Sequence, residues 1–324
     1  MKSKSLIILS SLVLALFPKA GFGQLPNLGA SSGFGLFTSA GAFTNNGSSS
    51  VTGDIGTNVG ALTGFPPGTY SGQKHVADAV SSQAATDLGL AYSDLSTRTI
   101  TAVIDVTLGV GQVLTPGVYS TGAASTINGV LTLNAQGDPN ALFIFQIDGT
   151  LSTTTASSVL LINNASLCNV FWQTTGAISL GANSVFRGNI VSGGAINLLD
   201  GALLHGRGLT TAGEIILNTN TVSLLPSAAG AITGTVFICQ GSDGITYTVP
   251  EITDATGYVW SLPAGATISS GANTNTITVN FSNTASSGNI TVYGTNACGG
   301  NGPVSPNFLV TVNTLPNTSL IYHF

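Results

Sequence analysis

The chain has 324 residues, of which only 6% are charged, and its twelve acidic residues outnumber its seven lysines and arginines. Because clustered lysine and arginine are lacking, nucleic acid and anionic membrane surfaces are excluded as partners. Hydrophobic residues make up 43% of the chain, which is too many for a disordered linker.

The N-terminus has the layout of a secretory signal peptide. Lys2 and Lys4 precede an apolar run from Leu6 to Phe17, and Gly21 and Gly23 occupy the −3 and −1 positions of a cleavage site. The run is too short to span a membrane. We therefore expect residues 1–23 to be removed and the protein to be exported without membrane insertion. The remaining chain keeps four basic residues against twelve acidic ones, a net charge of −8.

Short β runs broken by glycine, asparagine and serine fill the region from Phe34 to Val222, for example Val130–Leu133, Val159–Ile162 and Val170–Gln173. Short strands at regular spacing are typical of a sandwich, a barrel or a solenoid.

An internal repeat of about 18 residues favours the solenoid. When Phe171–Val185, Asn189–Leu203 and Arg207–Val222 are aligned, the shared columns are Thr174, Ser192 and Thr210, then Ile178, Ile196 and Ile215, then Leu180, Leu198 and Leu217. Eighteen residues make one coil of a three-sided β-solenoid with about six residues per side. We expect the Ile and Leu columns to stack inside the coil and the Thr and Ser column outside.

One segment before these repeats has helical periodicity. From His75 to Thr97, apolar residues recur at a spacing that places them on one face of a helix. The sequence therefore predicts a single long helix over about residues 73–97, with its alanine-rich face against the solenoid.

A second domain follows a loosened stretch at residues 225–231. Alternating runs such as Thr246–Val249, Thr276–Val279 and Ile290–Tyr293 predict an Ig-like or PKD-like β-sandwich over residues 232–314, with Trp260 in its core. The boundaries are then 24–224 for the solenoid and 315–324 for a tail.

The cysteines predict one disulfide. Cys239 and Cys298 bracket one segment of the second domain, and pairing them would close a loop of roughly 60 residues and contribute about 3–4 kcal/mol. Cys168 is then interpreted as a small buried hydrophobic residue.

No catalytic or metal-binding pattern is present in the sequence. The few basic residues and three scattered histidines do not supply the clustered ionisable groups that hydrolases and lyases need. No EF-hand or zinc spacing occurs, so we expect no enzyme activity, no metal and no cofactor.

Six motifs occur in order between residues 28 and 222 and together carry a family resemblance: VTGDIG (Val51–Gly56), GFPPGT (Gly64–Thr69), HVADAV (His75–Val80), LTPGVY (Leu114–Tyr119), GDPNALFIFQI (Gly137–Ile147) and CNVFWQ (Cys168–Gln173). The chain resembles microbial ice-binding proteins that fold as a discontinuous β-solenoid with an accessory helix, and its C-terminal part is similar to PKD-like repeats. The resemblance implies adsorption to ice through one flat solenoid face, without catalysis. The consequences would be recrystallisation inhibition, freezing-point depression or adhesion of cells to ice.

For the ice-contacting face we predict eight hydroxyl side chains: Thr174, Thr175, Ser192, Thr210 and Thr211, with Thr154, Thr155 and Ser179 behind them. We expect a monomer whose partner is the ice surface. An alternative stays open, namely an extracellular adhesin or structural module that binds a carbohydrate or a cell-surface partner. A groove with exposed aromatic side chains would favour that alternative.

Overall fold

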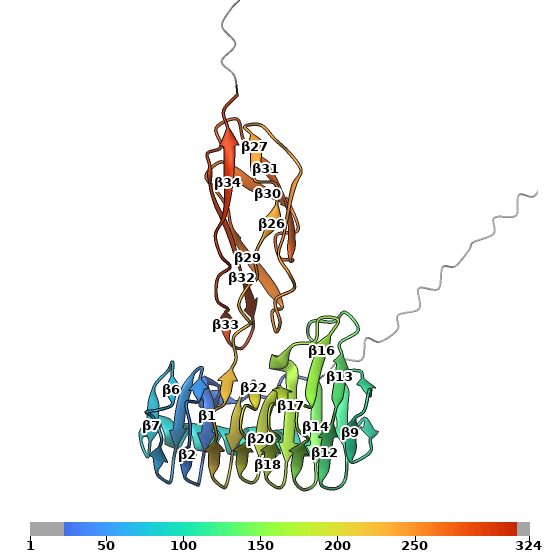
Figure 1. The fold of residues 1–324 in the computed structure, drawn as a ribbon. Coiled ribbons are helices and arrows are strands. Elements are labelled where there is room, and N and C mark those ends of the chain that lie inside the picture. Colours follow the sequence, from blue (N-terminus) through green and yellow to red (C-terminus); the bar gives the residue numbers. More distant parts are fainter. Residues whose placement is uncertain (1–22, 316–324) are drawn as a thin grey trace, which may run out of the picture.

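The computed structural model describes residues 23–315 and consists of a parallel β-solenoid followed by a smaller β-sandwich (Figure 1). The predicted fold class, a mainly β chain with a three-sided solenoid, one accessory helix and a C-terminal sandwich, is confirmed. The predicted signal peptide and C-terminal tail lie, but for one residue each, outside the described residues.

Three parallel sheets form the sides of the solenoid. Sheet A has the strand order β7 (Lys74–Val76), β4 (Asp54–Thr57), β1 (Phe34–Thr38), β23 (Gly208–Thr210), β20 (Asn189–Ser192), β17 (Val170–Thr174), β14 (Phe143–Ile147), β11 (Gly117–Ser120) and β8 (Ala102–Val103). Sheet B has the order β5 (Leu62–Thr63), β2 (Phe43–Asn45), β24 (Ile215–Leu217), β21 (Ile196–Leu198), β18 (Ile178–Leu180), β15 (Leu151–Thr153), β12 (Ser125–Asn128) and β9 (Thr107–Gly109). Sheet C has the order β10 (Val113–Leu114), β13 (Val130–Asn134), β16 (Ser158–Ile162), β19 (Val185–Arg187), β22 (Leu203–His205), β25 (Thr221–Ser223), β3 (Ser50–Val51) and β6 (Thr69–Tyr70).

The coils do not stack in chain order. The first coil, β1 to β3, pairs with the last coil, β23 to β25, and not with the coil that begins at β8. The early strands therefore form one end of the solenoid, and β8, β9 and β10 form the other end.

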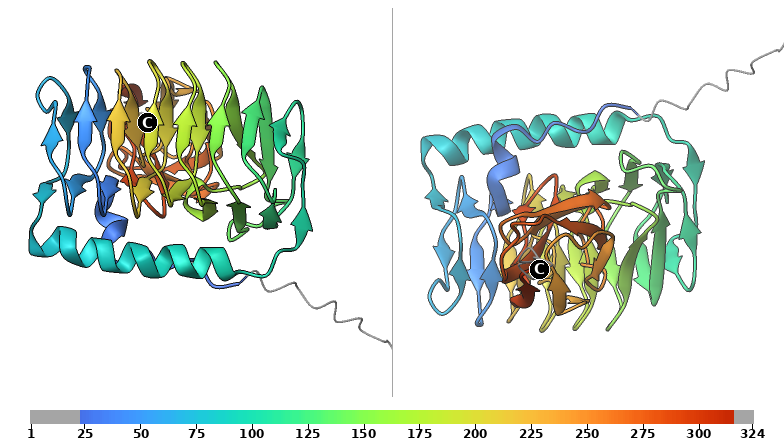
Figure 2. Two further views of the ribbon diagram at one scale, coloured as in Figure 1. Left: turned by 90° about the horizontal axis from the view of Figure 1, so that it is seen from below. Right: turned by 90° about the horizontal axis from the view of Figure 1, so that it is seen from above.

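The helix α1 (Ala79–Thr97) connects these two ends and runs along the solenoid (Figure 2). It begins later than the sequence predicted, because Lys74–Val76 pairs with β4 as strand β7 and Asp78 caps the helix by accepting from the Ser81 N–H. Its buried face, Ala84, Leu88, Ala91 and Leu95, packs on sheet A side chains that include Phe37, Ile144, Phe171, Val191 and Leu209. Sheet A is therefore covered on both faces.

Inside the solenoid, identical or similar side chains stack from coil to coil. Ile178 pairs with Ile196 and Ile196 with Ile215, as the repeat predicted, and all are buried. A column of aromatic rings, Tyr119, Phe145, Trp172 and Phe186, fills the interior beside them. This continuous apolar core holds the coils in register.

The C-terminal domain is a sandwich with its own core. One sheet has the order β26 (Thr233–Gly234), β28 (Ile245–Thr248), β31 (Thr276–Phe281) and β30 (Ala266–Ser270), and the other contains β27 (Phe237–Cys239), β34 (Phe308–Asn313), β32 (Gly288–Asn296), β29 (Gly257–Ser261) and β33 (Gly300–Asn301). Trp260 lies in the core, as predicted, together with Tyr247, Ile277 and Val292.

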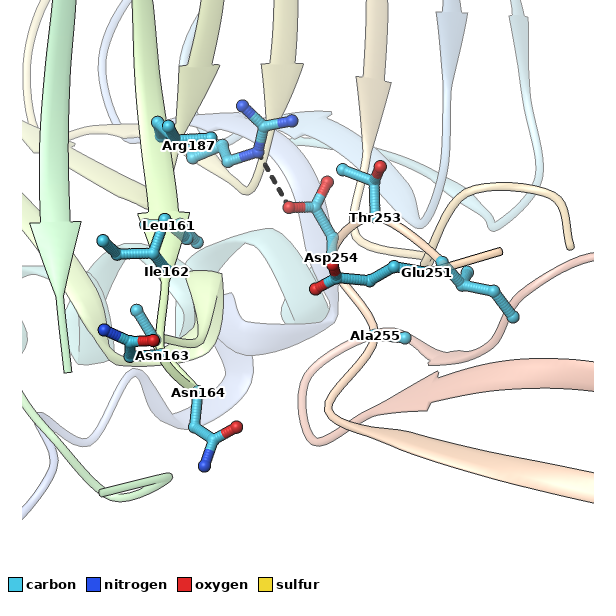
Figure 3. A pocket seen from close by; sticks show the side chains of 12 residues that line it. Leu161, Ile162, Asn163, Asn164, Arg187, Glu251, Thr253, Asp254 and Ala255 are labelled. Atoms are coloured by element: carbon cyan, nitrogen blue, oxygen red, sulfur yellow. Dashed lines mark hydrogen bonds and ion pairs between the residues drawn. The ribbon is translucent and has the colours of Figure 1, made fainter. Parts of the chain in front are cut away.

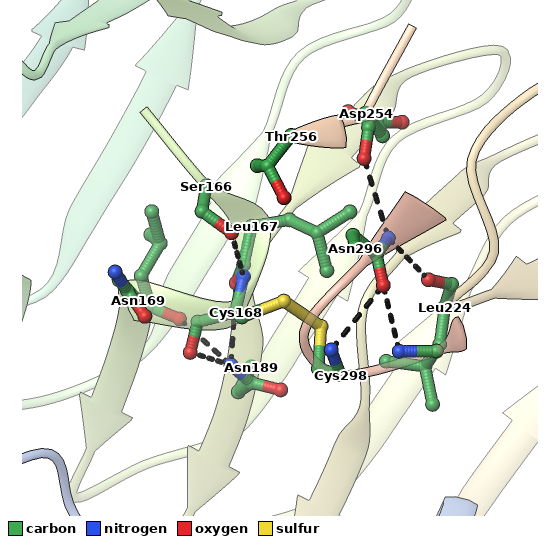
Figure 4. Close-up of a disulfide and its surroundings, with 12 residues drawn as sticks. Ser166, Leu167, Cys168, Asn169, Asn189, Leu224, Asp254, Thr256, Asn296 and Cys298 are labelled. Atoms are coloured by element: carbon green, nitrogen blue, oxygen red, sulfur yellow. Dashed lines mark hydrogen bonds between the residues drawn. A yellow bond between two sulfur atoms is a disulfide. The ribbon is translucent and has the colours of Figure 1, made fainter. Parts of the chain in front are cut away.

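The predicted pairing of Cys239 with Cys298 is wrong. Cys298 forms a disulfide with Cys168, which lies in the short 3₁₀ helix Leu167–Asn169 (Figure 4). Cys239 is exposed and unpaired. The disulfide therefore joins the C-terminal domain to the solenoid, and Cys168 is not a merely buried hydrophobic residue. Cys298 lies at the solenoid-proximal end of the domain, whereas Cys239 ends a strand that pairs with Phe308–Asn313.

Candidate functional site

The column of Thr174, Ser192 and Thr210 lies in register as predicted, but its orientation is the opposite of the prediction. The strands carrying these residues pair side by side, and all three side chains are fully buried. Their hydroxyls donate to backbone carbonyls in the turn from sheet A to sheet B, for example Thr210 Oγ1 to Gly194 O at 2.6 Å. Thr38 and Thr57 extend the same buried column. These hydroxyls satisfy carbonyls at a corner of the solenoid and cannot contact ice.

The other five predicted residues reach solvent at three different places. Thr175 and Thr211 lie in the turns from sheet A to sheet B, and Thr154 and Thr155 lie in the turn from sheet B to sheet C. Only Ser179 lies within a strand, β18 of sheet B, where it is half-buried. The structure therefore does not bring the eight predicted residues together as one face.

Among residues 23–315, no helix or domain covers sheet B, whereas the other two sides of the solenoid are covered. Sheet A carries α1, and sheet C carries the C-terminal domain through Arg187 and His205, which contact Asp254. In Figure 1 the labelled strands β2, β12 and β18 of sheet B lie on the side away from the C-terminal domain. In the left view of Figure 2, which is seen from below, the solenoid strands lie in front of the C-terminal domain.

One outward residue from each strand builds a continuous column across sheet B. Backbone pairing places eight residues in register, in the order Thr63, Thr44, Ile216, Asn197, Ser179, Ser152, Thr126 and Thr107. None of these residues is charged and none is buried. Thr126 Oγ1 and Ser152 Oγ lie 2.9 Å apart, so neighbouring coils share a hydrogen bond along the column.

Small and amide side chains flank this column. On one side, backbone hydrogen bonds align Ala61, Ala42, Glu214, Ala195 and Ala177. On the other side, Asn46 donates to Asn218, and Thr154 donates to Asn128. Glu214 is exposed and interrupts an otherwise uncharged row. The result is a wide sheet surface of methyl, hydroxyl and amide groups.

The sequence alone could have identified this column from the alternation of side chains along each strand. Residues between the inward Ile and Leu of each coil must point outward, because side chains alternate across a strand. Ser179, Asn197 and Ile216 occupy that position in the three aligned coils. The same rule applied to Phe43–Asn45 and Leu151–Thr153 selects Thr44 and Ser152.

A cleft between sheet C and the C-terminal domain is the second candidate for a functional site. It encloses about 480 Å³ between the loop after β16 and residues 251–255, and Arg187 pairs with Asp254 in its wall (Figure 3). Burial alone raises the pKa of Asp254, but the hydrogen bond from His205 and the charges of Arg187 and His205 outweigh it and hold that pKa below its ordinary value. This carboxylate is engaged in joining the domains.

Metal ligands do not gather anywhere in residues 23–315: no group of three or more His, Cys, Asp and Glu side chains is placed to hold an ion. Within the same residues, no helix has the length and hydropathy needed to cross a membrane.

Comparison with known proteins agrees with this geometry. The family model described as ice-binding-like matches residues 37–223, more than half of the chain. The chain belongs to the ice-binding-like family. A PKD-like domain model matches residues 225–307.

Relatives of this family are found in bacteria and fungi. The chain is 37% identical to the ice-binding protein of Nostoc sp. (strain HG1), over 68% of this chain and 82% of that protein. It is 30% identical to the ice-binding protein of Flavobacterium frigoris (strain PS1), over 62% of this chain and 77% of that protein. The crystal structure of an ice-binding protein from Antarctomyces psychrotrophicus superposes with a TM-score of 0.59 and 36% identity, covering 61% of this chain and 98% of that one. Each of these relatives is named an ice-binding protein.

Proposed function

We propose that this protein is an exported ice-binding protein that adsorbs to ice through sheet B. The observation that carries the proposal is the uncharged, in-register column from Thr63 to Thr107 on the solenoid side that no other element of the described chain covers. The ice-binding relatives that match the solenoid support the same function. We infer no catalytic role, no cofactor and no nucleic-acid partner, and we expect a monomer.

The physical basis is a match between two regular surfaces. Successive strands of a sheet lie about 4.8 Å apart, which is close to a repeat distance of the ice lattice, and the shared core keeps that spacing constant over eight strands. A threonine or serine hydroxyl anchors a water molecule, while neighbouring methyl groups restrict where the next water can lie. Charged groups would hold water in arrangements that do not fit ice, so an uncharged column favours ice-like water.

Export is supported by two separate features. The basic and apolar N-terminal segment has the order of a signal peptide. In addition, the disulfide between Cys168 and Cys298 is of a kind that persists in oxidising compartments outside the cytosol.

Tyrosine substitutions on the outward faces of sheet B and sheet C test the face. Thr126→Tyr and Ser179→Tyr place a large ring on sheet B, whereas Thr132→Tyr and Ser158→Tyr place the same ring on sheet C. We expect the sheet B variants to lose most of their inhibition of ice recrystallisation while the sheet C variants keep it, at unchanged melting temperature. Equal loss in both pairs would contradict the assignment of sheet B. No recrystallisation inhibition by the folded parent protein would contradict ice binding itself.

A further inference from the structure

Arg207 is a buried cation that has no anionic partner among the described residues. Its side chain joins three parts of the molecule: Nε donates to Ser32 O at 2.9 Å and Nη2 donates to Cys298 O at 3.2 Å. The third bond, from Nη1 to Asn189 Oδ1, measures 2.9 Å. The residue is only 6% exposed, and no carboxylate among residues 23–315 forms an ion pair with it.

The other two arginines of the described chain each form an ion pair with an aspartate. Arg98 pairs with Asp94 at 2.6 Å and Arg187 pairs with Asp254 at 2.8 Å. Burial without such a partner lowers the pKa of Arg207 to about 10. A buried guanidinium that faces only neutral acceptors keeps an uncompensated positive charge. A guanidinium has five N–H groups, and the three bonds named above leave two of them without a protein acceptor among the described residues.

The guanidinium lies in the wall of a cavity of about 460 Å³. The N-terminal segment Leu25–Leu28 forms one side, Phe171 and Asn189 of the solenoid form a second, and Ala297 and Cys298 of the C-terminal domain close the third. Figure 4 shows Asn189 beside the disulfide at this junction. Asn189 Nδ2 lies 3.2 Å from Val170 O and 3.3 Å from Cys168 O, which turns its amide oxygen toward Arg207. The cavity thus combines one fixed cation with apolar walls from Leu25, Leu28 and Phe171.

We propose that this cavity binds a small organic carboxylate, with the carboxylate on Arg207 and the apolar part against Leu28 and Phe171. Two parallel N–H groups on a planar guanidinium match the two oxygens of a carboxylate, and the apolar walls favour an aliphatic body over a purely inorganic anion. A bound carboxylate neutralises the buried charge and contacts the N-terminal segment, the solenoid and the C-terminal domain at once.

Isothermal titration of the purified full chain at constant ionic strength tests the proposal, with sodium butyrate, sodium sulfate and sodium chloride as titrants. We expect saturable binding of one butyrate per chain and at least tenfold weaker binding of sulfate and chloride. No saturable binding of butyrate would overturn the proposal. Sulfate binding as tight as butyrate would overturn the carboxylate class.

Two variants separate binding from structure. Arg207→Gln removes the cation, and Ala297→Glu adds a carboxylate at an exposed position of the cavity wall without touching the three bonds of Arg207. We expect both variants to lose butyrate binding at least tenfold. Lys74→Gln removes an equal charge from a residue outside the cavity and should bind as the parent does. If Arg207→Gln fails to fold, Ala297→Glu decides, and unchanged butyrate binding in that variant would overturn the proposal.

Discussion

Arg187 and Asp254 form an ion pair across the junction of the two domains, with Arg187 Nε 2.8 Å from Asp254 Oδ1. The second carboxylate oxygen lies 2.8 Å from His205 Nδ1, so two neighbouring strands of sheet C hold both oxygens of one side chain. The Asp254 side chain is 2% exposed. A contact this enclosed fixes how the C-terminal domain sits on the solenoid.

We predict that Asp254→Asn lowers the free energy of unfolding by about 3–5 kcal/mol at pH 7, because it leaves Arg187 buried without its partner. The pH dependence has a defined sign. Since the pKa of Asp254 in the folded protein lies below the ordinary value of an aspartate, its contribution to stability is complete above that ordinary value and is lost as the pH falls through the folded value. Urea unfolding at pH 7 and pH 3 measures both effects. The exposed residue Asp243 provides the control Asp243→Asn, and an equal loss in that variant would refute the assignment.

We predict that the double variant Cys168→Ala, Cys298→Ala loses about 4–5 kcal/mol of stability, because the disulfide closes a loop of 130 residues in the unfolded chain. The variant Cys239→Ser should match the parent, since Cys239 is exposed and unpaired. Mass spectrometry of a non-reduced digest identifies the pair directly. A linked peptide containing Cys239 and Cys298 would show that the connectivity described above is wrong.

We predict that Thr210→Val destabilises the solenoid by about 1–3 kcal/mol, because the carbonyls of Gly194 and Ala212 lose their hydroxyl donor in a buried turn. At equal concentrations of folded protein, recrystallisation inhibition should stay unchanged, since the side chain is fully buried. Thr211→Val, at the neighbouring half-exposed position, is the control for stability. Loss of ice activity in folded Thr210→Val would mean that this corner takes part in binding.

We predict that Glu214→Ala raises recrystallisation inhibition, because it replaces the charge beside Ala42 and Ala195 with the methyl group that the rest of that row carries. The stability should change by no more than about 0.5 kcal/mol, as is usual for an exposed residue. Glu251→Ala removes a charge of the same sign from the C-terminal domain and should leave the ice activity as it was. A drop in activity for Glu214→Ala would indicate that the row does not face ice.

The periodic features of the fold could be predicted from the sequence, and the choice of face could not. The Ile and Leu columns at 178, 196 and 215 repeat because identical side chains stack between coils, so their register and burial followed from spacing alone. Thr174, Ser192 and Thr210 repeat equally well, but they end their strands at a corner, where a hydroxyl can turn inward and bond a carbonyl. Periodicity reports which residues are equivalent; it does not report which side of a turn they point to.

Long-range contacts could not be predicted from the sequence for a related reason. Cys168 and Cys298 are 130 residues apart, and neither lies in a repeat that would fix its neighbours. The same holds for Arg187 with Asp254, because one residue comes from the solenoid and the other from a loop of the sandwich. Which side of the solenoid stays free depends on where α1 and the C-terminal domain pack, so sheet B could be assigned only once both were in place.

The interleaving of the first and last coils constrains how the molecule can be made. During synthesis, strands β1 to β6 emerge first, yet the coil that pairs with their inner edge, β23 to β25, is the last of the solenoid to appear. The solenoid therefore cannot fold at that edge by adding one coil after another in chain order. The two earliest coils keep an exposed apolar edge until about 140 further residues, from the end of β6 at Tyr70 to the start of β23 at Gly208, have been added. Chains truncated before β23 should therefore aggregate rather than act as shorter working versions.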